Sequence, residues 1–380
     1  MNSMLPALDV FLTFLRLGCT SFGGPVAHLG YFREEFVNRK KWLSDADYAD
    51  LVALCTFLPG PSSSQVGMSI GNLRAGTVGA ILAWVGFTTP SFLIMLALAL
   101  GAQEVLGGGL VRALSLLTLG VILSAVLGMA KTLTPEWSRR GIALVSGLIM
   151  VLWPTAWTSI VVIVLGGLYG LRFFRQAGEH QSTPVAFRKT WVYLGVALGL
   201  LVVLPLLSFT PYLALLSDMY RTGSLVFGGG HVVLPLLQPV ATWLTPEQFL
   251  GAYGAAQAIP GPVFTISTFL GATFPQVNPV LGAVVATVGI FLPAMLLVLA
   301  IMPVWNSIKT RPALQAALKG VNAAVVGLLL AALLDAVVHI RPNTVLEWLW
   351  VVLSFVGLHF LKLPAHLVVL VGGALGYFLF

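Results

Sequence analysis

The sequence predicts an all-α polytopic membrane protein built from two inverted-topology repeats, with Pro/Gly-broken or re-entrant helices in each repeat. Three observations lead to this fold class. The chain is 58% hydrophobic and only 9% charged, whereas soluble domains contain about 25% charged residues. Four motifs occur twice in the same order. Equivalent loops of the two copies carry opposite charge bias, which indicates that the copies cross the membrane in opposite senses.

The duplication is read from motifs that keep their order and nearly their spacing. Arg16–Gly24 recurs as Arg221–Gly229, and Pro59-Gly60-Pro61 recurs as Pro260-Gly261-Pro262. The other two motifs are a Gly/Ala run that ends in proline and a glycine-rich helix segment: Gly79–Pro90 with Gly282–Pro293, and Gly166–Gly170 with Gly372–Gly376. We therefore predict a first repeat over 1–178, a cytoplasmic linker with a linking transmembrane helix over 179–209, and a second, inverted repeat over 210–380.

The predicted elements follow from the apolar runs. Runs long enough to span a bilayer lie at 76–101, 113–130, 191–208, 281–304 and 321–338. In the first repeat, two segments that enter the membrane and return, 6–30 and 45–73, precede two full spans. A pair of shorter segments follows near 141–153 and 156–173. The span 191–208 has no partner in the repeat, and it would invert the second copy.

The surplus of basic residues, which gives a net charge of +7, is interpreted as a record of topology. The basic loop Arg33–Lys41 is expected in the cytoplasm, whereas its counterpart Leu237–Phe249 has no Lys or Arg. The next loop pair shows the opposite bias, with Glu104 and Arg112 in the first copy and three basic residues in the second: Lys309, Arg311 and Lys319. No nucleic-acid partner is predicted from this charge.

The Pro-Gly-Pro segments predict broken helices at the binding site. Pro59-Gly60-Pro61 stops the apolar run Leu51–Leu58, and the polar residues Ser62–Gln65 begin a second short helix. A helix N-terminus inside the membrane exposes unpaired N–H groups and a positive dipole end, which favour an oxyanion. Broken helices at matching positions of inverted repeats mark transporter binding sites. The predicted substrate-binding residues here are Pro59, Gly60, Pro61, Ser62, Ser63, Ser64, Gln65, Pro260, Gly261, Pro262 and Thr265, with Ser267 and Thr268 close by.

The Phe-Gly-Gly segments form a second pair of breaks. Paired glycines permit positive φ and close approach to a ligand, although in membrane proteins they also serve tight helix packing. We favour packing for the Gly166–Gly170 and Gly372–Gly376 motifs, and ligand binding for the breaks. The candidate substrate-binding residues at these breaks are Gly23, Gly24, Pro25, Gly228, Gly229, Gly230 and His231.

Charged and titratable residues near the breaks are candidates for attracting or gating the ligand. Arg16 and Arg221 occupy equivalent positions, and a charge in an apolar segment pairs, faces a cavity or extends to the interface. Four residues are candidate proton or gating groups: His28, His231, Asp218 and Asp335. A structural hydrogen-bonding role is the alternative for both histidines. The acidic residues of the first basic loop region are expected to be solvated: Glu34, Glu35, Asp45, Asp47 and Asp50.

Catalytic and metal signatures are weak. Gly67–Gly71 matches G-x-S-x-G, but that motif requires a strand-turn-helix setting. We predict no catalytic residue, no metal and no cofactor; a membrane-embedded enzyme acting on lipid phosphates is the alternative from another class. Cys19 and Cys55 are expected to be small buried side chains rather than a redox pair.

The combined motifs resemble the chromate ion transporter family in its long-chain, bidomain form. The resemblance rests on Arg16–Pro25, Phe57–Pro61, Phe227–His231 and Ile259–Pro262, and it covers nearly the whole chain. It implies a multi-pass secondary transporter of the inner (cytoplasmic) membrane that exports chromate and confers chromate resistance, with sulfate as the physiological analogue. The implied partners are the chromate or sulfate oxyanion and the lipid bilayer, and a homodimer is permitted.

Export of a dianion needs no nucleotide. Moving one charge through 100 mV is worth about 2.3 kcal/mol, and a dianion gains roughly twice as much. Membrane potential or ion exchange is therefore the expected driving force. Chromate and sulfate are both tetrahedral dianions, so a transporter or channel for sulfate or another anion is the alternative within this class.

Overall fold

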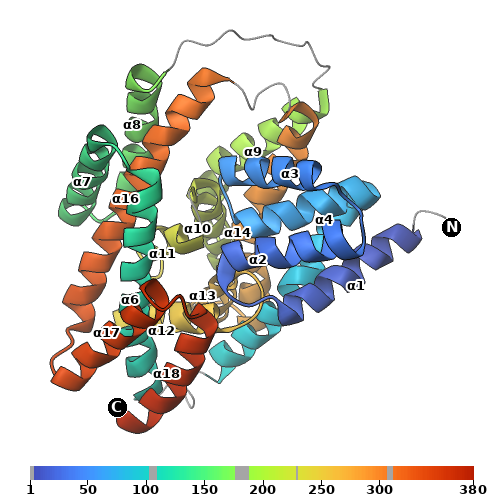
Figure 1. Ribbon diagram of the computed structural model, residues 1–380. Coiled ribbons are helices and arrows are strands. Elements are labelled where there is room, and N and C mark those ends of the chain that lie inside the picture. The colour runs from blue at the N-terminus through green and yellow to red at the C-terminus, as the bar shows by residue number, and fades with distance from the viewer. Residues whose placement is uncertain (1–3, 102–108, 176–187, 228–229, 306–310) are drawn as a thin grey trace. The chain divides into compact units, whose positions relative to one another are not determined.

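The computed structural model describes residues 4–101, 109–175, 188–227, 230–305 and 311–380, and every regular element in these ranges is a helix (Figure 1). The prediction of an all-α protein is confirmed. Residues 176–178 of the predicted first repeat, residues 179–187 of the predicted linker, and the loop residues Glu104 and Lys309 lie outside the described ranges.

Five helices are long and apolar enough to cross a membrane, and they confirm a polytopic membrane protein. They are Ser62–Leu100, Gly109–Leu133, Lys189–Leu206, Pro279–Val304 and Pro312–Ile340. Each contains or overlaps one of the five predicted apolar runs. Shorter apolar helices lie at Trp157–Phe173, Val263–Thr273, Val345–His359 and Ala365–Leu379.

The helices of the first repeat follow the predicted order. They are α1 (Met4–Thr20), α2 (Gly24–Arg33), the π-helix η1 (Glu34–Arg39), α3 (Asp45–Phe57), α4 (Ser62–Leu100), α6 (Gly109–Leu133), α7 (Trp137–Leu152) and α8 (Ala156–Phe173). The linking helix is α9 (Arg188–Leu206).

The helix α4 consists of two arms joined by a sharp bend. Ala75 and Gly76 have non-helical dihedrals, and Gly76 has φ +61°. The arms touch where Gly71 meets Gly79, because a Cβ built on Gly71 would lie 2.2 Å from the Gly79 carbonyl oxygen. The first arm therefore runs from the break at Pro61 to the bend, and the second arm runs from the bend to Leu100. The second arm corresponds to the predicted span.

The second repeat contains the corresponding elements. They are α10 (Pro211–Leu225), η2 (Gly230–Val232), α11 (Val233–Leu237), α12 (Pro246–Ala258), η3 (Val263–Thr265), α13 (Ile266–Thr273), α14 (Pro279–Ile301), η4 (Met302–Val304), α16 (Pro312–Ile340), α17 (Val345–His359) and α18 (Ala365–Leu379). Gly271 meets Gly282 at 2.2 Å by the same measure, so α13 and α14 repeat the contact between the two arms of α4.

The chain forms two compact units, and each unit takes segments from both repeats. We call Met1–Gly107, Phe187–Gly230 and Ala255–Pro303 the broken-helix unit. We call Gly108–Ala186, His231–Gly254 and Val304–Phe380 the bundle unit. The division of the duplication at 178 and 209 stays a prediction, and the compact units take segments from both sides of it.

Helices of the bundle unit pack with partners from the other repeat. The long helix α16 packs on α7 and α8, and α6 packs on α17 and α18 (Figure 1). The glycine motifs allow these contacts, since a Cβ on Gly170 would lie 2.2 Å from the Ala316 carbonyl oxygen and one on Gly376 would lie 2.2 Å from Ala113 Cβ. The predicted packing role of these motifs is confirmed.

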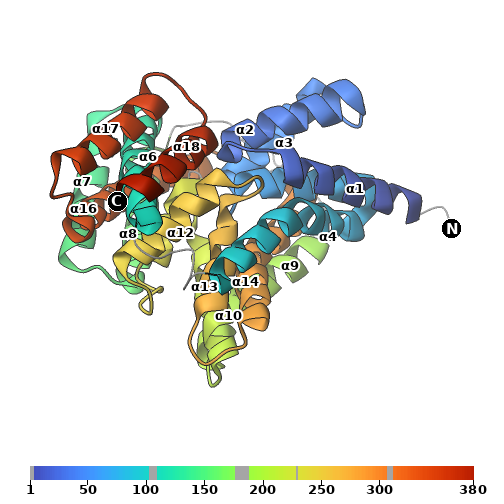
Figure 2. The same ribbon diagram turned by 90° about the horizontal axis from the view of Figure 1, so that it is seen from below.

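Within the broken-helix unit, α1 lies along α4 and α10 lies along α14 (Figure 2). Cys55 is buried on α3, but Cys19 on α1 is exposed, so the expectation that both cysteines are buried is wrong for Cys19. Its position on the outer face of α1 accounts for the difference, because an apolar sequence context does not distinguish a lipid-facing side chain from a core one.

Candidate functional site

The two Pro-Gly-Pro breaks share one backbone conformation. Gly60 has φ +125° and Gly261 has φ +96°, in the region that favours glycine. Pro61 and Pro262 are extended residues that precede the helices starting at Ser62 and Val263, and neither helix start has a side-chain cap. The breaks therefore leave backbone N–H groups of two helix starts without a capping side chain.

Each Pro-Gly-Pro break is hydrogen bonded to the Phe-Gly-Gly segment of the other repeat. The Gly60 N–H donates to the Val226 carbonyl at 2.7 Å, and the Gly261 N–H donates to the Ser21 carbonyl at 2.9 Å. Ser21 and Val226 precede the repeated phenylalanines at equivalent positions. Such reciprocal contacts are the pattern that a two-fold relation produces. The Pro-Gly-Pro motif of each repeat therefore pairs with the Phe-Gly-Gly motif of the other repeat. We call the two Pro-Gly-Pro breaks in this arrangement the crossed breaks.

The third repeated motif completes this arrangement. A Cβ on Gly60 would lie 2.8 Å from Ala294 Cβ, and one on Gly261 would lie 2.8 Å from Ser91 Oγ. Ala294 and Ser91 directly follow the prolines of the Gly/Ala motifs, Pro293 and Pro90. Gly60 therefore packs against α14 beside Pro293, and Gly261 packs against α4 beside Pro90.

Two further repeated glycines hold the helices that flank the breaks. A Cβ on Gly18 would lie 2.7 Å from the Phe87 carbonyl oxygen, and one on Gly223 would lie 2.1 Å from the Ile290 carbonyl oxygen. These contacts bring α1 against α4 and α10 against α14. Sequence reasoning gave these glycines no role, although their repetition was the signal that could have identified one.

The start of α4 carries buried polar side chains with unused hydrogen-bonding capacity. His28 Nδ1 lies 3.2 Å from Ser63 Oγ, and Gln65 Nε2 donates to the Pro59 carbonyl at 2.8 Å. Ser64 Oγ and Gln65 Oε1 are buried and have no hydrogen-bond partner among the described residues. Each buried unsatisfied group costs about 1–3 kcal/mol. Together with the uncapped N–H groups, these atoms leave unused hydrogen-bonding capacity at the start of α4.

Three buried hydroxyls near this site were not predicted. Ser21 and Thr88 have hydroxyl oxygens without a partner in the described part of the chain, and Ser91 donates to the Thr88 carbonyl at 3.0 Å. Ser21 and Ser91 both contact Gly261, as described above. A single Ser or Thr in an apolar helix carries little sequence signal, but Ser21 adjoins a repeated phenylalanine, Ser91 adjoins a repeated proline, and Thr88 lies two residues before that proline.

The equivalent positions of the second repeat are apolar except at Ser64, which faces Thr265. Aligned on the motifs, the polar residues face these counterparts: Ser21 and Val226, His28 and Val233, Ser63 and Phe264, Gln65 and Ile266, Thr88 and Phe291, Ser91 and Ala294. The rings of Phe264 and Phe291 contact each other at 5.9 Å between centroids. The polar chemistry of the crossed breaks is therefore concentrated in the first repeat.

Polar groups of the second break are mostly occupied by local partners. The Thr265 hydroxyl donates to the Pro262 carbonyl at 2.8 Å, and Thr268 and Thr287 share a hydrogen bond of 2.8 Å. Ser267 Oγ is buried without a partner among the described residues. Pro260 flanks Gly261 as Pro59 flanks Gly60.

Both candidate arginines are paired with carboxylates. Arg16 Nη2 lies 2.5 Å from Glu35 Oε2, and Arg39 Nη1 lies 3.2 Å from the same oxygen. Arg221 Nη2 lies 2.8 Å from Asp218 Oδ1. The expectation that Glu35 is solvated is wrong, since its side chain is only 5% exposed. Glu35 lies on the π-helix η1, and the guanidinium groups of Arg16 on α1 and Arg39 on η1 compensate its charge.

The remaining candidates divide between the two units. Gly23 and Gly24 have φ +95° and +75°, Pro25 lies in the first turn of α2, and the space beside Gly24 is open. Gly230 begins η2, whereas Gly228 and Gly229 lie outside the described residues.

His231 and Asp335 belong to the bundle unit. His231 Nδ1 lies 2.9 Å from the Tyr253 hydroxyl, and Asp335 accepts a hydrogen bond from Gln238.

Metal binding has no support in the described ranges, where no group of three or more His, Cys, Asp or Glu residues could hold an ion. The geometry that the breaks do present is a set of hydroxyl, amide and backbone N–H groups beside helix starts.

Comparison with known proteins gives a consistent family assignment. A family model described as "Chromate transporter" matches residues 8–171 and again 213–377. A chromate transport protein of Cupriavidus metallidurans is 31% identical, over 89% of this chain and 84% of the relative. One of Pseudomonas aeruginosa is 29% identical, over 98% and 92%. An uncharacterised transporter of Methanocaldococcus jannaschii is also 29% identical, over 98% and 94%. No solved structure matches the chain.

Proposed function

This chain belongs to the chromate transporter family, and we propose that it exports chromate from the cytoplasm through the crossed breaks of the broken-helix unit. The observation that supports this proposal most directly is the group of buried, unsatisfied polar atoms at the uncapped start of α4. A membrane protein retains such a costly group where a ligand satisfies it. The relatives named as chromate transport proteins support chromate as that ligand.

The chemistry of the cluster suits a tetrahedral oxyanion. Chromate has only acceptor oxygens, and the site offers donors: the Ser64 hydroxyl, the Ser63 hydroxyl beside His28, and the N–H groups at the start of α4. The positive end of the helix dipole adds favourable potential for an anion. We propose that the predicted residues of both breaks line this site, with the first repeat providing most of the hydrogen bonds.

Arg16 and Arg221 are proposed to attract or gate the anion from their ion pairs. Glu35 and Asp218 hold the two guanidinium groups in the resting arrangement. An arriving dianion competes with these carboxylates for the same donors, so exchange of partners would couple entry of the ion to a change in the segments that carry them.

We further propose that the repeats are inverted and rock about the site. The crossed hydrogen bonds of Gly60 and Gly261 support a two-fold relation between the repeats, and the opposite loop charges support an axis in the membrane plane. In the inner membrane, potential or ion exchange would drive the dianion outward and confer resistance. Sulfate or another anion is the alternative substrate. A homodimer would use a surface other than the Gly166 and Gly372 motifs, which contact helices of the same chain.

The test is uptake of radioactive chromate into everted vesicles that contain the chain. We expect saturable accumulation that excess sulfate inhibits and that an uncoupler abolishes. Ser64→Ala should reduce the accumulation at equal protein level. Accumulation of sulfate but not chromate would select the alternative substrate, and accumulation of neither by folded protein would overturn the assignment.

A further inference from the structure

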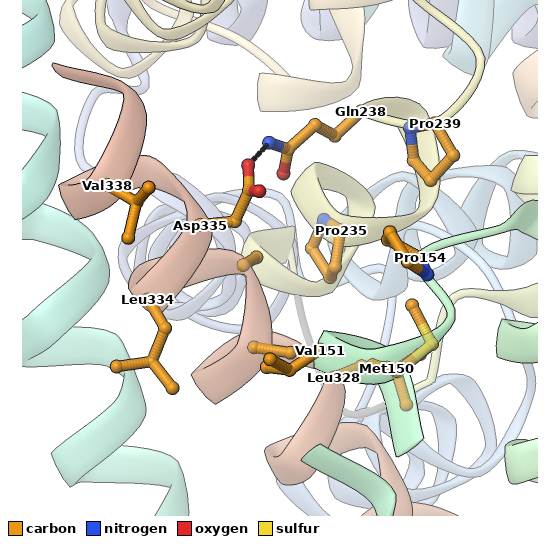
Figure 3. Close-up of a pocket in the computed structure, with 12 residues that line it drawn as sticks. Met150, Val151, Pro154, Pro235, Gln238, Pro239, Leu328, Leu334, Asp335 and Val338 are labelled. Carbon is orange, nitrogen blue, oxygen red and sulfur yellow. Dashed lines mark hydrogen bonds between the residues drawn. The ribbon is translucent and has the colours of Figure 1, made fainter. Parts of the chain in front are cut away.

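The bundle unit contains a cavity of about 390 Å³, a size typical of sites for small ligands (Figure 3). Its walls come from α7 and the turn after it, from α11 and the residues that follow, and from α16. The residues that line it are Met150, Val151, Pro154, Pro235, Gln238, Pro239, Leu328, Ala331, Ala332, Leu334, Asp335 and Val338. None of these residues belongs to the crossed breaks.

The polar atoms of this lining are mainly acceptors. Asp335 provides the one charged side chain of the lining, and Gln238 donates its amide N–H to Asp335 Oδ2 (Figure 3). That bond fixes the Gln238 amide, so that its carbonyl oxygen remains an acceptor beside the carboxylate. The proline residues of the lining have no N–H to donate. An acceptor-lined, negatively charged cavity favours a cation that donates hydrogen bonds.

The cavity opens among side chains that are suited to lipid contact. Val151, Leu334 and Val338 line it and are 50%, 50% and 58% exposed. Asp335 lies in the last turns of α16, which ends at Ile340, so the carboxylate is near the end of a membrane-spanning helix. The negative end of the α16 dipole adds to the potential that favours a cation there. His339 Nδ1 lies 3.2 Å from Asp335 Oδ2 and completes the surroundings of the carboxylate.

We propose that this cavity binds a bilayer lipid with a primary ammonium head group, an ethanolamine phospholipid. The ammonium group has three N–H donors, which match the Asp335 carboxylate and the Gln238 carbonyl oxygen. Its acyl chain lies along the apolar wall at Leu334 and Val338. A glycerol head group lacks the positive charge, and a choline head group lacks N–H donors. The site therefore selects ethanolamine, and it is independent of the proposed anion site.

Native mass spectrometry of the full chain in detergent tests this selection. Ethanolamine, choline and glycerol phospholipids with identical acyl chains are added at equal concentration. We expect the ethanolamine lipid to bind about tenfold more tightly than the glycerol lipid, as a charge-assisted hydrogen bond predicts, with choline between them. Asp335→Asn should remove the preference and Asp335→Glu should retain it. Glu136→Gln, an exposed acid of the same unit outside the cavity, is the matched control.

A second variant tests the cavity itself. Ala331→Leu fills space in the lining and should weaken ethanolamine-lipid binding while the protein keeps its elution volume in size-exclusion chromatography. This variant also decides the question if Asp335→Asn does not fold. Equal binding of the three lipids by the unmodified protein would overturn the proposal, as would unchanged selectivity in folded Asp335→Asn or unchanged affinity in folded Ala331→Leu.

Discussion

The two breaks of the broken-helix unit have the same backbone and different chemistry. Gly60 and Gly261 share positive φ, the crossed hydrogen bond and the seat beside a proline. Around them, the first repeat places Ser21, His28 and Ser63 where the second places Val226, Val233 and Phe264. The duplication has therefore preserved the residues that shape both breaks, while the polar side chains around them are concentrated in the first repeat.

The largest effect is expected from changing the shared backbone. Gly60→Ala and Gly261→Ala should both prevent stable folding, because positive φ costs a non-glycine residue about 1–3 kcal/mol and the added Cβ meets Ala294 or Ser91. Thermal stability in detergent measures the loss. Gly195→Ala on α9, where no heavy atom lies within 4 Å of the added Cβ, is the control and should be neutral or stabilising. Normal stability of either break variant would contradict the shared geometry.

The next effect separates the chemistry of the two sides. Ser64 and Thr265 are equivalent, but only the Thr265 hydroxyl has a local partner. Ser64→Ala should raise thermal stability, because it removes an unsatisfied buried group, and should lower chromate transport about tenfold. Thr265→Val should cost about 1 kcal/mol of stability and lower transport less. Vesicle uptake and melting curves check both changes. Equal transport losses would remove the proposed asymmetry.

The paired arginines offer a third comparison. Glu35→Gln should destabilise the protein by about 1 kcal/mol, because it leaves Arg16 and Arg39 beside a neutral, buried side chain. Asp218→Asn should cost less, since the carboxylate is more exposed and the pair lies within one helix. Chemical denaturation of both variants against the parent measures the difference. A larger cost for Asp218→Asn would show that the second pair is the structural one.

The smallest effect is expected at the positions that follow the prolines. Ser91→Ala should raise the KM for chromate only about twofold, because the Ser91 hydroxyl donates to the Thr88 carbonyl and must exchange that partner to bind the anion. The reciprocal change, Ala294→Ser, should leave the KM unchanged, because the added hydroxyl would lie against Gly60 and can donate to a carbonyl of its own helix, as Ser91 does. Initial rates of vesicle uptake decide between them. An improved KM for Ala294→Ser would place the anion closer to the second repeat.

The sequence predicted the features that depend on local backbone requirements. The Pro-Gly-Pro stops, the positive φ of Gly23 and the packing of the Gly166 motif follow from what glycine and proline permit. The crossed hydrogen bonds and the burial of Glu35 could not be predicted, because they depend on which segment of the other repeat, or which turn of η1, comes near. The contact of Ser21 with Gly261 could not be predicted for the same reason.

The exchange of partners in the bundle unit has a consequence for how the protein is made. The helices α6, α7 and α8 leave the ribosome well before α16, α17 and α18 are synthesised, yet α7 and α8 pack on α16. Until α16 is inserted, Gly166 and Gly170 of α8 lack the helix that they contact in the structure. Truncation of the nascent chain before α16 should therefore leave those faces unpaired, and this part of the native packing forms only after α16 has been inserted.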